Sequence, residues 1–374
     1  MSLKQVIVVG GGLAGLTSAL HLSQVGVGVS LIEKHDYPRH KVCGEYLSNE
    51  VLPYLKGLGL DPFELGAKTI DHFELSSVKG KAIRAKLPLG GFSLSRYTLD
   101  HELLKRAQLL GVELIKDTVT DIKFENDRFL VKLKDNGIKE STFVIGAFGK
   151  RSNLDQKLQR KFLNSKAPYL AVKAHYSGDY PENLVGLHHF YGGYCGVSNV
   201  EHNTLNICYI TEYSEFKKFR NIEDFQNQVL SKNKILKSIF NDAKMDFEKP
   251  LTISQISFDS KPLIDNHMIM CGDSAGMIHP LCGNGMSMAI QGAKLASELI
   301  EQYFQGGLSR VQLERNYKKL WNHSFRLRLQ TGRGLARLFR MKSVALYAMN
   351  SLKRFPGLLR HIISMTHGKF IESI

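Results

Sequence analysis

The sequence predicts an α/β protein in which a doubly wound domain with a parallel sheet is interrupted by an antiparallel-sheet domain and followed by C-terminal helices. Two strand–turn–helix patterns, over residues 5–22 and 267–303, carry the glycine-rich turns typical of a parallel sheet with crossover helices. Between them, residues 169–210 alternate apolar and polar side chains with Gly and Asn breaks, a pattern typical of antiparallel strands. The chain therefore combines two kinds of sheet.

The first of these patterns carries a phosphate-binding turn. A short β-branched strand, Gln5 to Val9, leads into Gly10-Gly11-Gly12-Leu13-Ala14-Gly15 and then into a helix. Gly10 allows a tight turn, Gly12 lets the backbone approach a pyrophosphate, and Gly15 lets helix and strand pack closely. The next strand ends in Glu33, whose carboxylate suits a ribose hydroxyl and would repel a 2′-phosphate. These residues favour FAD or NAD over NADP at this site.

The middle of the chain predicts the inserted sheet. A half-exposed antiparallel strand is expected over 70–83, a helix over 96–111, strands over 112–144 with an Asn136-Gly137 turn, a helix over 215–240 and a strand over 251–258. We expect a discontinuous cofactor domain (1–69, 97–165 and 252–305), a substrate-binding sheet domain (70–96 and 166–251) and a basic helical region (306–374).

The second strand–turn–helix pattern lies late in the chain. A strand beginning at His267 runs into Gly272-Asp273, then Pro280, Gly283 and a helix from Gly285 to Tyr303. An Asp at the end of a strand can hold a sugar-like hydroxyl. The helix start directs its positive dipole end at whatever lies before it, which suits the negative charge of a reduced flavin.

Four motifs in the same order resemble those of the FAD-dependent monooxygenases and reductases of the p-hydroxybenzoate hydroxylase superfamily. They are the two glycine motifs, the pattern Arg96-x-x-x-Asp100-x-x-Leu103-x-x-x-Ala107, and Pro38-Arg39-His40-Lys41-Val42-Cys43-Gly44-Glu45. The last of them is similar to the PxxKxCG segment of the geranylgeranyl reductase family. The resemblance spans roughly residues 1–300 and implies a Rossmann-type FAD-binding domain.

The resemblance also implies roles for individual residues. Glu33 would bind the adenosine ribose, Arg96 would reach the FAD from its helix, Asp273 would bind the ribityl chain, and residues 41–44 would lie beside the flavin. The expected cofactor-binding residues are Gly10, Gly12, Leu13, Ala14, Gly15, Glu33, Lys34, Lys41, Val42, Cys43, Gly44, Arg96, Gly149, Gly272, Asp273, Pro280, Gly283, Gly285 and Met286.

Candidate catalytic side chains are few. Cys43 is a candidate proton donor or polar contact at the flavin edge, with a small buried packing residue as the alternative. Tyr191 and Tyr194, with His188 and His189, fall on the strands expected to face the substrate, where Tyr or His can act as acid or base. Each of these is also a common core residue type.

Two departures from the family patterns bear on the reaction. Phe148 stands where the superfamily often carries an acid, so nicotinamide handling by the hydroxylase route is in question and NAD(P)H is only one candidate for the external electron donor. The aromatic YxWxFP strand of geranylgeranyl reductases is replaced by residues 191–197, which puts a prenyl substrate in question. Because Trp321 is the only tryptophan, the WxWxIP motif of flavin halogenases is absent and halogenation is not expected.

Composition excludes several classes of protein. The chain has 374 residues, 43% hydrophobic and 23% charged, which excludes a disordered tail, a collagen-like repeat and a disulfide scaffold. Five cysteines without a CxxC pair predict neither a disulfide framework nor a metal site. No secretory signal is apparent, and no stretch approaches the roughly 20 apolar residues that span a bilayer. We expect a cytoplasmic protein.

The net charge of +15 is concentrated at the C-terminus. Residues 326–374 hold ten Lys and Arg residues and one acidic residue, Glu372. Within them, residues 335–347 and 358–363 mix apolar and basic positions at helical spacing, which suits a helix on an anionic membrane at the inner membrane face. The alternative is a helical cap whose apolar face packs on the body of the protein. Nucleic acid is not expected, since no binding motif accompanies the charge.

These observations lead to one function with one alternative. The expected function is that of an FAD-dependent oxidoreductase acting on a lipophilic or aromatic small molecule, by C=C reduction or by hydroxylation. The alternative is a flavin-binding electron carrier or membrane-associated protein without substrate turnover of its own, which would have a shallow surface near the flavin.

Overall fold

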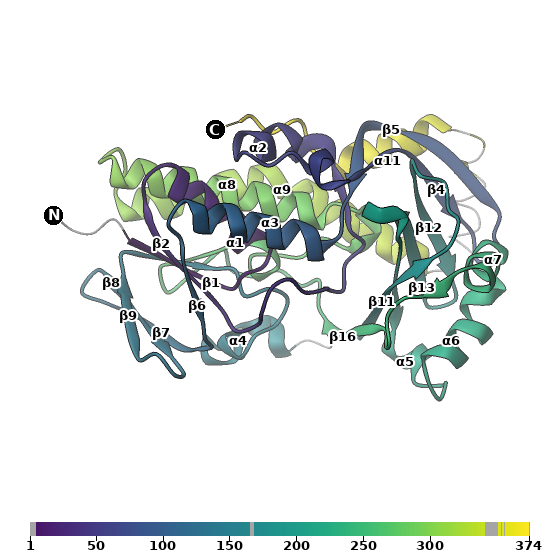
Figure 1. Cartoon of the computed structure of the whole chain (residues 1–374), viewed down its shortest axis with the longest axis horizontal. Coiled ribbons are helices and arrows are strands. Elements are labelled where there is room, and N and C mark those ends of the chain that lie inside the picture. Colours follow the sequence, from purple (N-terminus) through teal and green to yellow (C-terminus); the bar gives the residue numbers. More distant parts are fainter. Residues whose placement is uncertain (1–4, 165–167, 341–350, 353, 355, 374) are drawn as a thin grey trace.

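The computed structural model describes residues 5–164, 168–340, 351–352, 354 and 356–373, and contains a six-stranded sheet with parallel strands at its centre (Figure 1). Its order is β17 (Ile264–Asp265), β18 (Met268–Met270), β10 (Phe143–Gly146), β1 (Gln5–Val9), β2 (Gly28–Glu33) and β6 (Glu113–Lys116). All neighbours pair in parallel except β17 with β18. Val6, Ile7 and Val8 are fully buried, as expected of a strand covered on both faces.

Helices cover one face of this sheet. Helix α1 (Leu13–Gln24) packs against α3 (Arg96–Leu109) and α8 (Gly285–Phe304). The three-stranded antiparallel sheet of β7 (Val119–Glu125), β8 (Arg128–Leu133) and β9 (Ile138–Ser141) contacts β10 and β1 and lies away from these helices in Figure 1. The two strand–turn–helix patterns predicted from the sequence thus meet, since α1 and α8 lie side by side.

A larger sheet forms the other half of the molecule. Its path is β15 (Lys244–Met245), β11 (Tyr169–Ser177), β14 (Leu205–Glu212), β13 (Gly193–Asn199), β12 (Leu184–Phe190), β4 (Lys68–Ser76), β5 (Ala82–Ser93) and β3 (Tyr46–Ser48), with β16 (Leu251–Ile256) paired to β11. Pairing is antiparallel except between β4 and β12. Alternate residues of β11 face opposite cores: Ala171 belongs to one, Leu170 and Val172 to the other.

The sheet assignment corrects the expected boundaries at two places. β3 lies within the segment 1–69 that we assigned to the cofactor domain, yet Tyr46 pairs with Ser93 of β5. β16 spans the start of the segment 252–305, yet Ile253 pairs with Ala171 of β11. Both strands lie at the edges of the larger sheet. No residue pattern within or beside either strand indicates that it pairs with the larger sheet.

The helix expected over 215–240 is three short helices. They are α5 (Tyr213–Phe216), α6 (Ile222–Gln228) and α7 (Lys234–Asp242). The side chains of Asn221 and Asn233 accept backbone N–H groups at the starts of α6 and α7. Each Asn therefore starts a new helix instead of continuing the one before it.

The C-terminal helices pack on both halves of the molecule. Helix α9 (Arg310–Arg340) lies against α8, and α11 (Pro356–Thr366) lies against β5 and α9 (Figure 1). Leu359 and Ile363 of α11 are buried, so its apolar face is turned inward. Residues 341–347 of the amphipathic stretch predicted over 335–347 lie outside the described residues. Among the described helices, none has the length and apolar character needed to cross a membrane.

A buried carboxylate anchors this C-terminal region. Glu50 is fully buried; it accepts a hydrogen bond from Arg328 Nη1 at 3.2 Å and another from the backbone N–H of Gly368. Its backbone carbonyl accepts the N–H of Ile371 at 2.7 Å. The end of the chain is thereby joined to the segment after β3.

We expect Arg328→Met to lower the free energy of unfolding by about 3 kcal/mol, because it leaves the carboxylate of Glu50 buried without its cation. Urea denaturation measures this. The control is Lys218→Met, which removes the exposed pair with Glu215 and should change stability by less than about 0.5 kcal/mol. Equal effects of the two substitutions would contradict this role for Glu50.

Candidate active site

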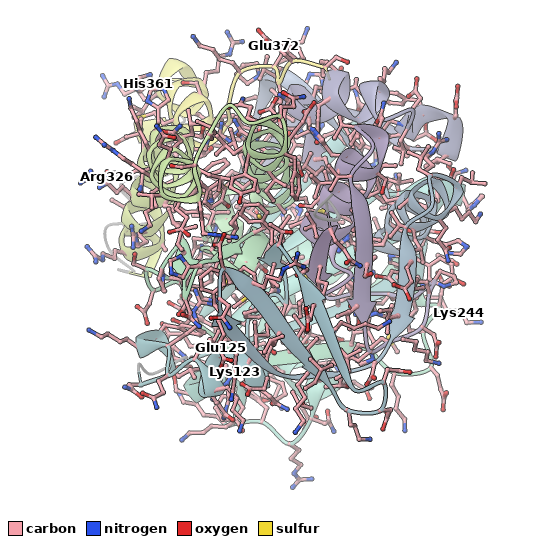
Figure 2. All side chains as sticks on the ribbon, turned by 90° about the vertical axis from the view of Figure 1, so that its left-hand side faces the viewer. Lys123, Glu125, Lys244, Arg326, His361 and Glu372 are labelled. Atoms are coloured by element: carbon pink, nitrogen blue, oxygen red, sulfur yellow. The ribbon has the colours of Figure 1, made fainter. Side chains whose placement is uncertain are left out.

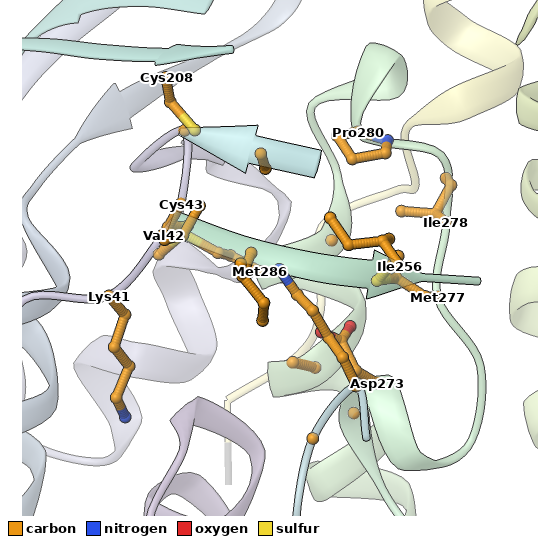
Figure 3. Close-up of a pocket in the computed structure, with 18 of the residues that line it drawn as sticks. Lys41, Val42, Cys43, Cys208, Ile256, Asp273, Met277, Ile278, Pro280 and Met286 are labelled. Carbon is orange, nitrogen blue, oxygen red and sulfur yellow. The ribbon is translucent and has the colours of Figure 1, made fainter. Parts of the chain in front are cut away.

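A cavity of about 1160 Å³ extends between the two large sheets. One end is lined by Gly10, Gly12 and Glu33, and the other by Leu187 and Ile210. Figure 3 shows the middle of it, where Val42 and Cys43 lie beside Met286 and the side chain of Lys41 points away from them. The volume exceeds the roughly 300–1,000 Å³ of ordinary ligand pockets. It is large enough for an extended cofactor together with a substrate.

The glycine-rich turn offers a phosphate-binding position. Gly10 has a φ of +105°, and a Cβ there would lie 2.4 Å from the carbonyl oxygen of Ala147. A Cβ on Gly15 would lie 2.0 Å from the carbonyl oxygen of Gly10. At Gly12, the N-cap residue of α1, a Cβ would meet no described atom within 4 Å. The first N–H groups of α1 therefore open onto free space in the cavity, which fits a pyrophosphate.

Glu33 lies beside this turn. It is buried at the end of β2, and its Oε2 accepts the N–H of Gly11 at 2.9 Å. Its Oε1 accepts the N–H of His35 at 3.0 Å and lies 3.4 Å from Arg39 Nη2. The next residue, Lys34, is exposed and lines the same end of the cavity. The carboxylate is thus fixed near the turn, where the sequence predicts an adenosine ribose.

The second glycine motif meets the first across the cavity. Gly272 and Gly283 have φ values of +61° and +63°, and α8 begins at Gly285. Ser274 Oγ accepts the N–H of Gly149 at 2.8 Å, which ties the end of β10 to the Gly272-Asp273 turn. Asp273, Pro280, Gly283, Gly285, Met286 and Gly149 all line the cavity.

Sequence reasoning missed two cations that hold these loops. Lys261 Nζ donates to the carbonyl oxygens of Lys150 and Asp273 at 2.9 and 2.8 Å, and burial lowers its pKa to about 8. The buried side chain of Arg160 donates to Asp155 and to the carbonyl oxygen of Ser274. Neither lies in a recognisable motif, so nothing local could have identified them.

Lys41 and Arg96 share one carboxylate. Asp100 Oδ2 lies 2.6 Å from Lys41 Nζ, and both Asp100 oxygens accept from the guanidinium of Arg96 at 2.7 Å. Burial opposes the charged form of Asp100, yet the two cations hold its pKa below the ordinary value. Lys41 Nζ also donates to the carbonyl oxygen of Gly11 at 3.2 Å. Both cations line the cavity.

Glu45 links the same segment to the larger sheet. It is fully buried with a φ of +55°, and it accepts from Lys173 Nζ at 2.9 Å and from the N–H of Arg96 at 2.9 Å. His175 Nε2 lies 2.8 Å from its other oxygen. Burial would raise the pKa of Glu45, but His175 and Lys173 hold it below the ordinary value. Lys173 and His175 were not predicted, because an isolated Lys and His on a strand usually face solvent.

The candidate catalytic residues do not all reach the cavity. Cys43 Sγ lines it and lies 3.2 Å from Met286 Sδ. Tyr194 is buried and lines it, and burial raises the pKa of its phenol well above the ordinary value, so it keeps its proton at neutral pH. Tyr191 is 42% exposed, in the turn between β12 and β13, and is not among the lining residues.

The expectation that Tyr191 faces the substrate is therefore corrected. Gly192, at a φ of +88°, ends the strand alternation in this turn. His188 and His189 do not line the cavity either. They point to Ser76, whose hydroxyl lies 3.0 Å from His188 Nδ1 and whose carbonyl oxygen lies 3.3 Å from His189 Nδ1.

Comparison with known proteins agrees with this geometry. The sequence profile described as the FAD binding domain matches residues 4–315. The digeranylgeranylglycerophospholipid reductase of Methanosarcina mazei is 28% identical over 84% of this chain and 80% of its own. The conditioned medium factor receptor 1 of Dictyostelium discoideum is 24% identical over 87% and 68%. The flavin-dependent brominase Bmp2 superposes with a TM-score of 0.79 at 18% identity, over 98% of this chain and 93% of its own.

Fold and site together define an FAD-dependent oxidoreductase. The chain belongs to the FAD binding domain family, and the resemblance to the geranylgeranyl reductase-like branch that its motifs indicated is confirmed.

We expect Gly12→Ala to weaken FAD binding at least roughly tenfold while changing the stability of the apoprotein by less than about 1 kcal/mol. The added methyl group meets no described protein atom but enters the space that a pyrophosphate needs. Titration of the apoprotein with FAD measures this. Gly334→Ala is the matched control, since its Cβ also meets no described atom, but on α9. Unchanged FAD affinity in Gly12→Ala would contradict this site.

Proposed function

We propose that this flavoprotein acts on a lipophilic or aromatic small molecule, either by reducing a C=C bond or by hydroxylation. The observation that carries the proposal is the continuity of the cavity: its cofactor end joins an apolar chamber without a dividing wall. Side chains from the larger sheet and the C-terminal helices line that chamber, among them Phe73, Leu75, Leu87, Val185, Leu187, Ile210, Leu359 and Ile363.

The residues where the cofactor end meets the apolar chamber would have different roles. Bound FAD supplies the electron transfer; the protein supplies position, electrostatics and the exclusion of water. Residues 41–44 and Met286 would hold the flavin end of the cofactor, with Asp273 at the ribityl chain and Glu33 at the ribose. Tyr194, protonated and facing the chamber, is the side chain best placed to give a proton to the substrate. NAD(P)H stays a candidate external donor.

The chamber favours substrate turnover over the electron-carrier alternative. A carrier needs a shallow surface near the flavin, whereas Tyr194 and Ile210 form a buried wall beyond it. The likeness to a brominase supports the fold alone, because the identity is 18%. Since Trp321 of α9 is the only tryptophan, and its ring lies against Gly276 and Gly292, we do not propose halogenation.

We expect Ala171→Phe to weaken the binding of apolar ligands at least roughly tenfold and to leave FAD binding unchanged, because Ala171 is buried in the chamber wall and a phenyl ring would fill it. The change of the flavin absorption spectrum on titration with dodecanol measures ligand binding. Ala82→Phe is the control, with the same gain in size at an exposed position of β5. Ligand affinity that is the same in both variants would exclude the chamber as the substrate site.

Product analysis separates the two reactions. For a candidate substrate converted by the reduced holoprotein, C=C reduction gives a product with two more hydrogen atoms and consumes no oxygen. Hydroxylation consumes O₂ and places one of its oxygen atoms in the product. Turnover under ¹⁸O₂, followed by mass spectrometry, distinguishes these outcomes, and a failure of every lipophilic candidate to react would favour the electron-carrier alternative.

The basic C-terminal region supports contact with an anionic membrane surface. Arg326, Arg337, Arg354, Arg360 and Lys369 are exposed, and none forms an ion pair with another described residue. Figure 2 shows Arg326 and His361 along the same edge of the molecule. Such cations each contribute about 1 kcal/mol near an anionic bilayer. We expect sedimentation with phosphatidylglycerol vesicles that decreases as salt increases.

A further inference from the structure

Helix α11 has two faces with different surroundings. Its inner face lines the apolar chamber through Leu359, Ile362, Ile363 and Thr366. Leu358 lines the chamber too but is 43% exposed, which places it at the rim. The helix therefore forms an outer wall of the chamber and separates it from solvent at this point.

The outward side of the same segment is basic. Arg354, Arg360 and Lys369 are exposed and lack a carboxylate partner within the described part of the chain, and Phe370, next to Lys369 in the sequence, is 57% exposed. Glu372 is the single acid between residues 326 and 374. Cations flanked by exposed apolar side chains fit a bilayer with anionic head groups, because charge and burial then act together.

Few contacts hold the end of this wall. Beyond α11, the N–H of Gly368 and the guanidinium of Arg328 on α9 donate to the carboxylate of Glu50, and the N–H of Ile371 donates to its backbone carbonyl. Toward the chamber the contacts of α11 are apolar, with β5 and α9. Apolar contacts are not directional, and hydrocarbon can replace them, whereas water cannot.

We propose that α11 is a lid that docks onto an anionic bilayer and opens the apolar chamber to lipophilic molecules dissolved in it. This rests on the function proposed above. In the closed state the apolar face of α11 is buried against the chamber wall. In the open state the same face can be buried in the bilayer. A membrane therefore binds the open state more strongly than the closed one, which is the condition for a ligand to shift a conformational equilibrium.

Two cysteines of the chamber report on its opening. Cys208 and Cys282 line the cavity, and burial raises the pKa of each thiol to about 12, so both should react slowly while the lid is closed. Cys195 is fully buried and is not a lining residue, so its reaction would signal unfolding. Alkylation of the holoprotein by an uncharged maleimide, followed by mass spectrometry of each site, measures all three.

We expect phosphatidylglycerol vesicles to accelerate alkylation of Cys208 and Cys282 by about tenfold, as a tenfold larger open population would require. Phosphatidylcholine vesicles should have no effect, and Cys195 should stay unmodified. Arg354→Glu, Arg360→Glu and Lys369→Glu together should abolish the acceleration. The matched control is the exposed set Lys123→Glu, Lys132→Glu and Lys134→Glu, of which Lys123 lies on β7, Lys132 on β8 and Lys134 directly after β8. Figure 2 shows Lys123 away from Arg326 and His361.

Two results would contradict the proposal that α11 is a lid. One is binding of the protein to phosphatidylglycerol vesicles with unchanged alkylation of both chamber cysteines, which means docking without opening. The other is an equal increase of the alkylation rate with phosphatidylglycerol and with phosphatidylcholine vesicles. Neither result bears on the proposed function, which is contradicted instead if dodecanol does not perturb the flavin spectrum of the holoprotein. Ile363→Ala, which loosens the inner contact, should raise alkylation without vesicles.

Discussion

The attachment of residues 41–45 to both halves of the molecule is the constraint on which the site depends. Lys41 is tied through Asp100 to α3 and through Gly11 to the phosphate-binding turn, while Glu45 is tied to β11 by Lys173 and His175. Removing either carboxylate would leave buried cations without partners, a cost of several kcal/mol. Cys43 lies between these two anchors, so its position against Met286 is set by both sheets at once.

The C-terminal helices give the chamber its outer side. Without them the apolar face of the larger sheet would be an open surface, and lipophilic side chains such as Leu75 and Leu187 would meet water. Glu50 holds the end of this cover through hydrogen bonds, whereas the cover itself is held by apolar contacts. The apolar inner face of α11, with exposed cations on the helix (Arg360) and on either side of it (Arg354 and Lys369), explains why the sequence favours both a membrane helix and a packed cap there.

Sequence prediction succeeds where neighbouring residues fix a structural feature and fails where residues remote in the sequence fix it. The turn at Gly10 to Gly15 and the turn at Gly272 are fixed by their own glycines, and the structure has both where the pattern predicts them. Tyr191 was misplaced because strand alternation ends at Gly192, and β16 was assigned to the wrong sheet because its partner, β11, is about 80 residues away in the chain. Lys173, His175, Arg160 and Lys261 gain their roles only from partners remote in sequence.

The sequence by itself determined the cofactor half: a strand, a glycine turn, a helix and an acid suffice, because the backbone N–H groups and the short carboxylate that we propose to bind FAD are spaced locally. Tertiary structure alone decided the substrate half. Whether an apolar helix faces a chamber or a membrane, and whether a lysine is buried beside a glutamate or solvated, depends on which segments pack together. That packing joins β3, β16 and α11 to one chamber from three distant parts of the chain.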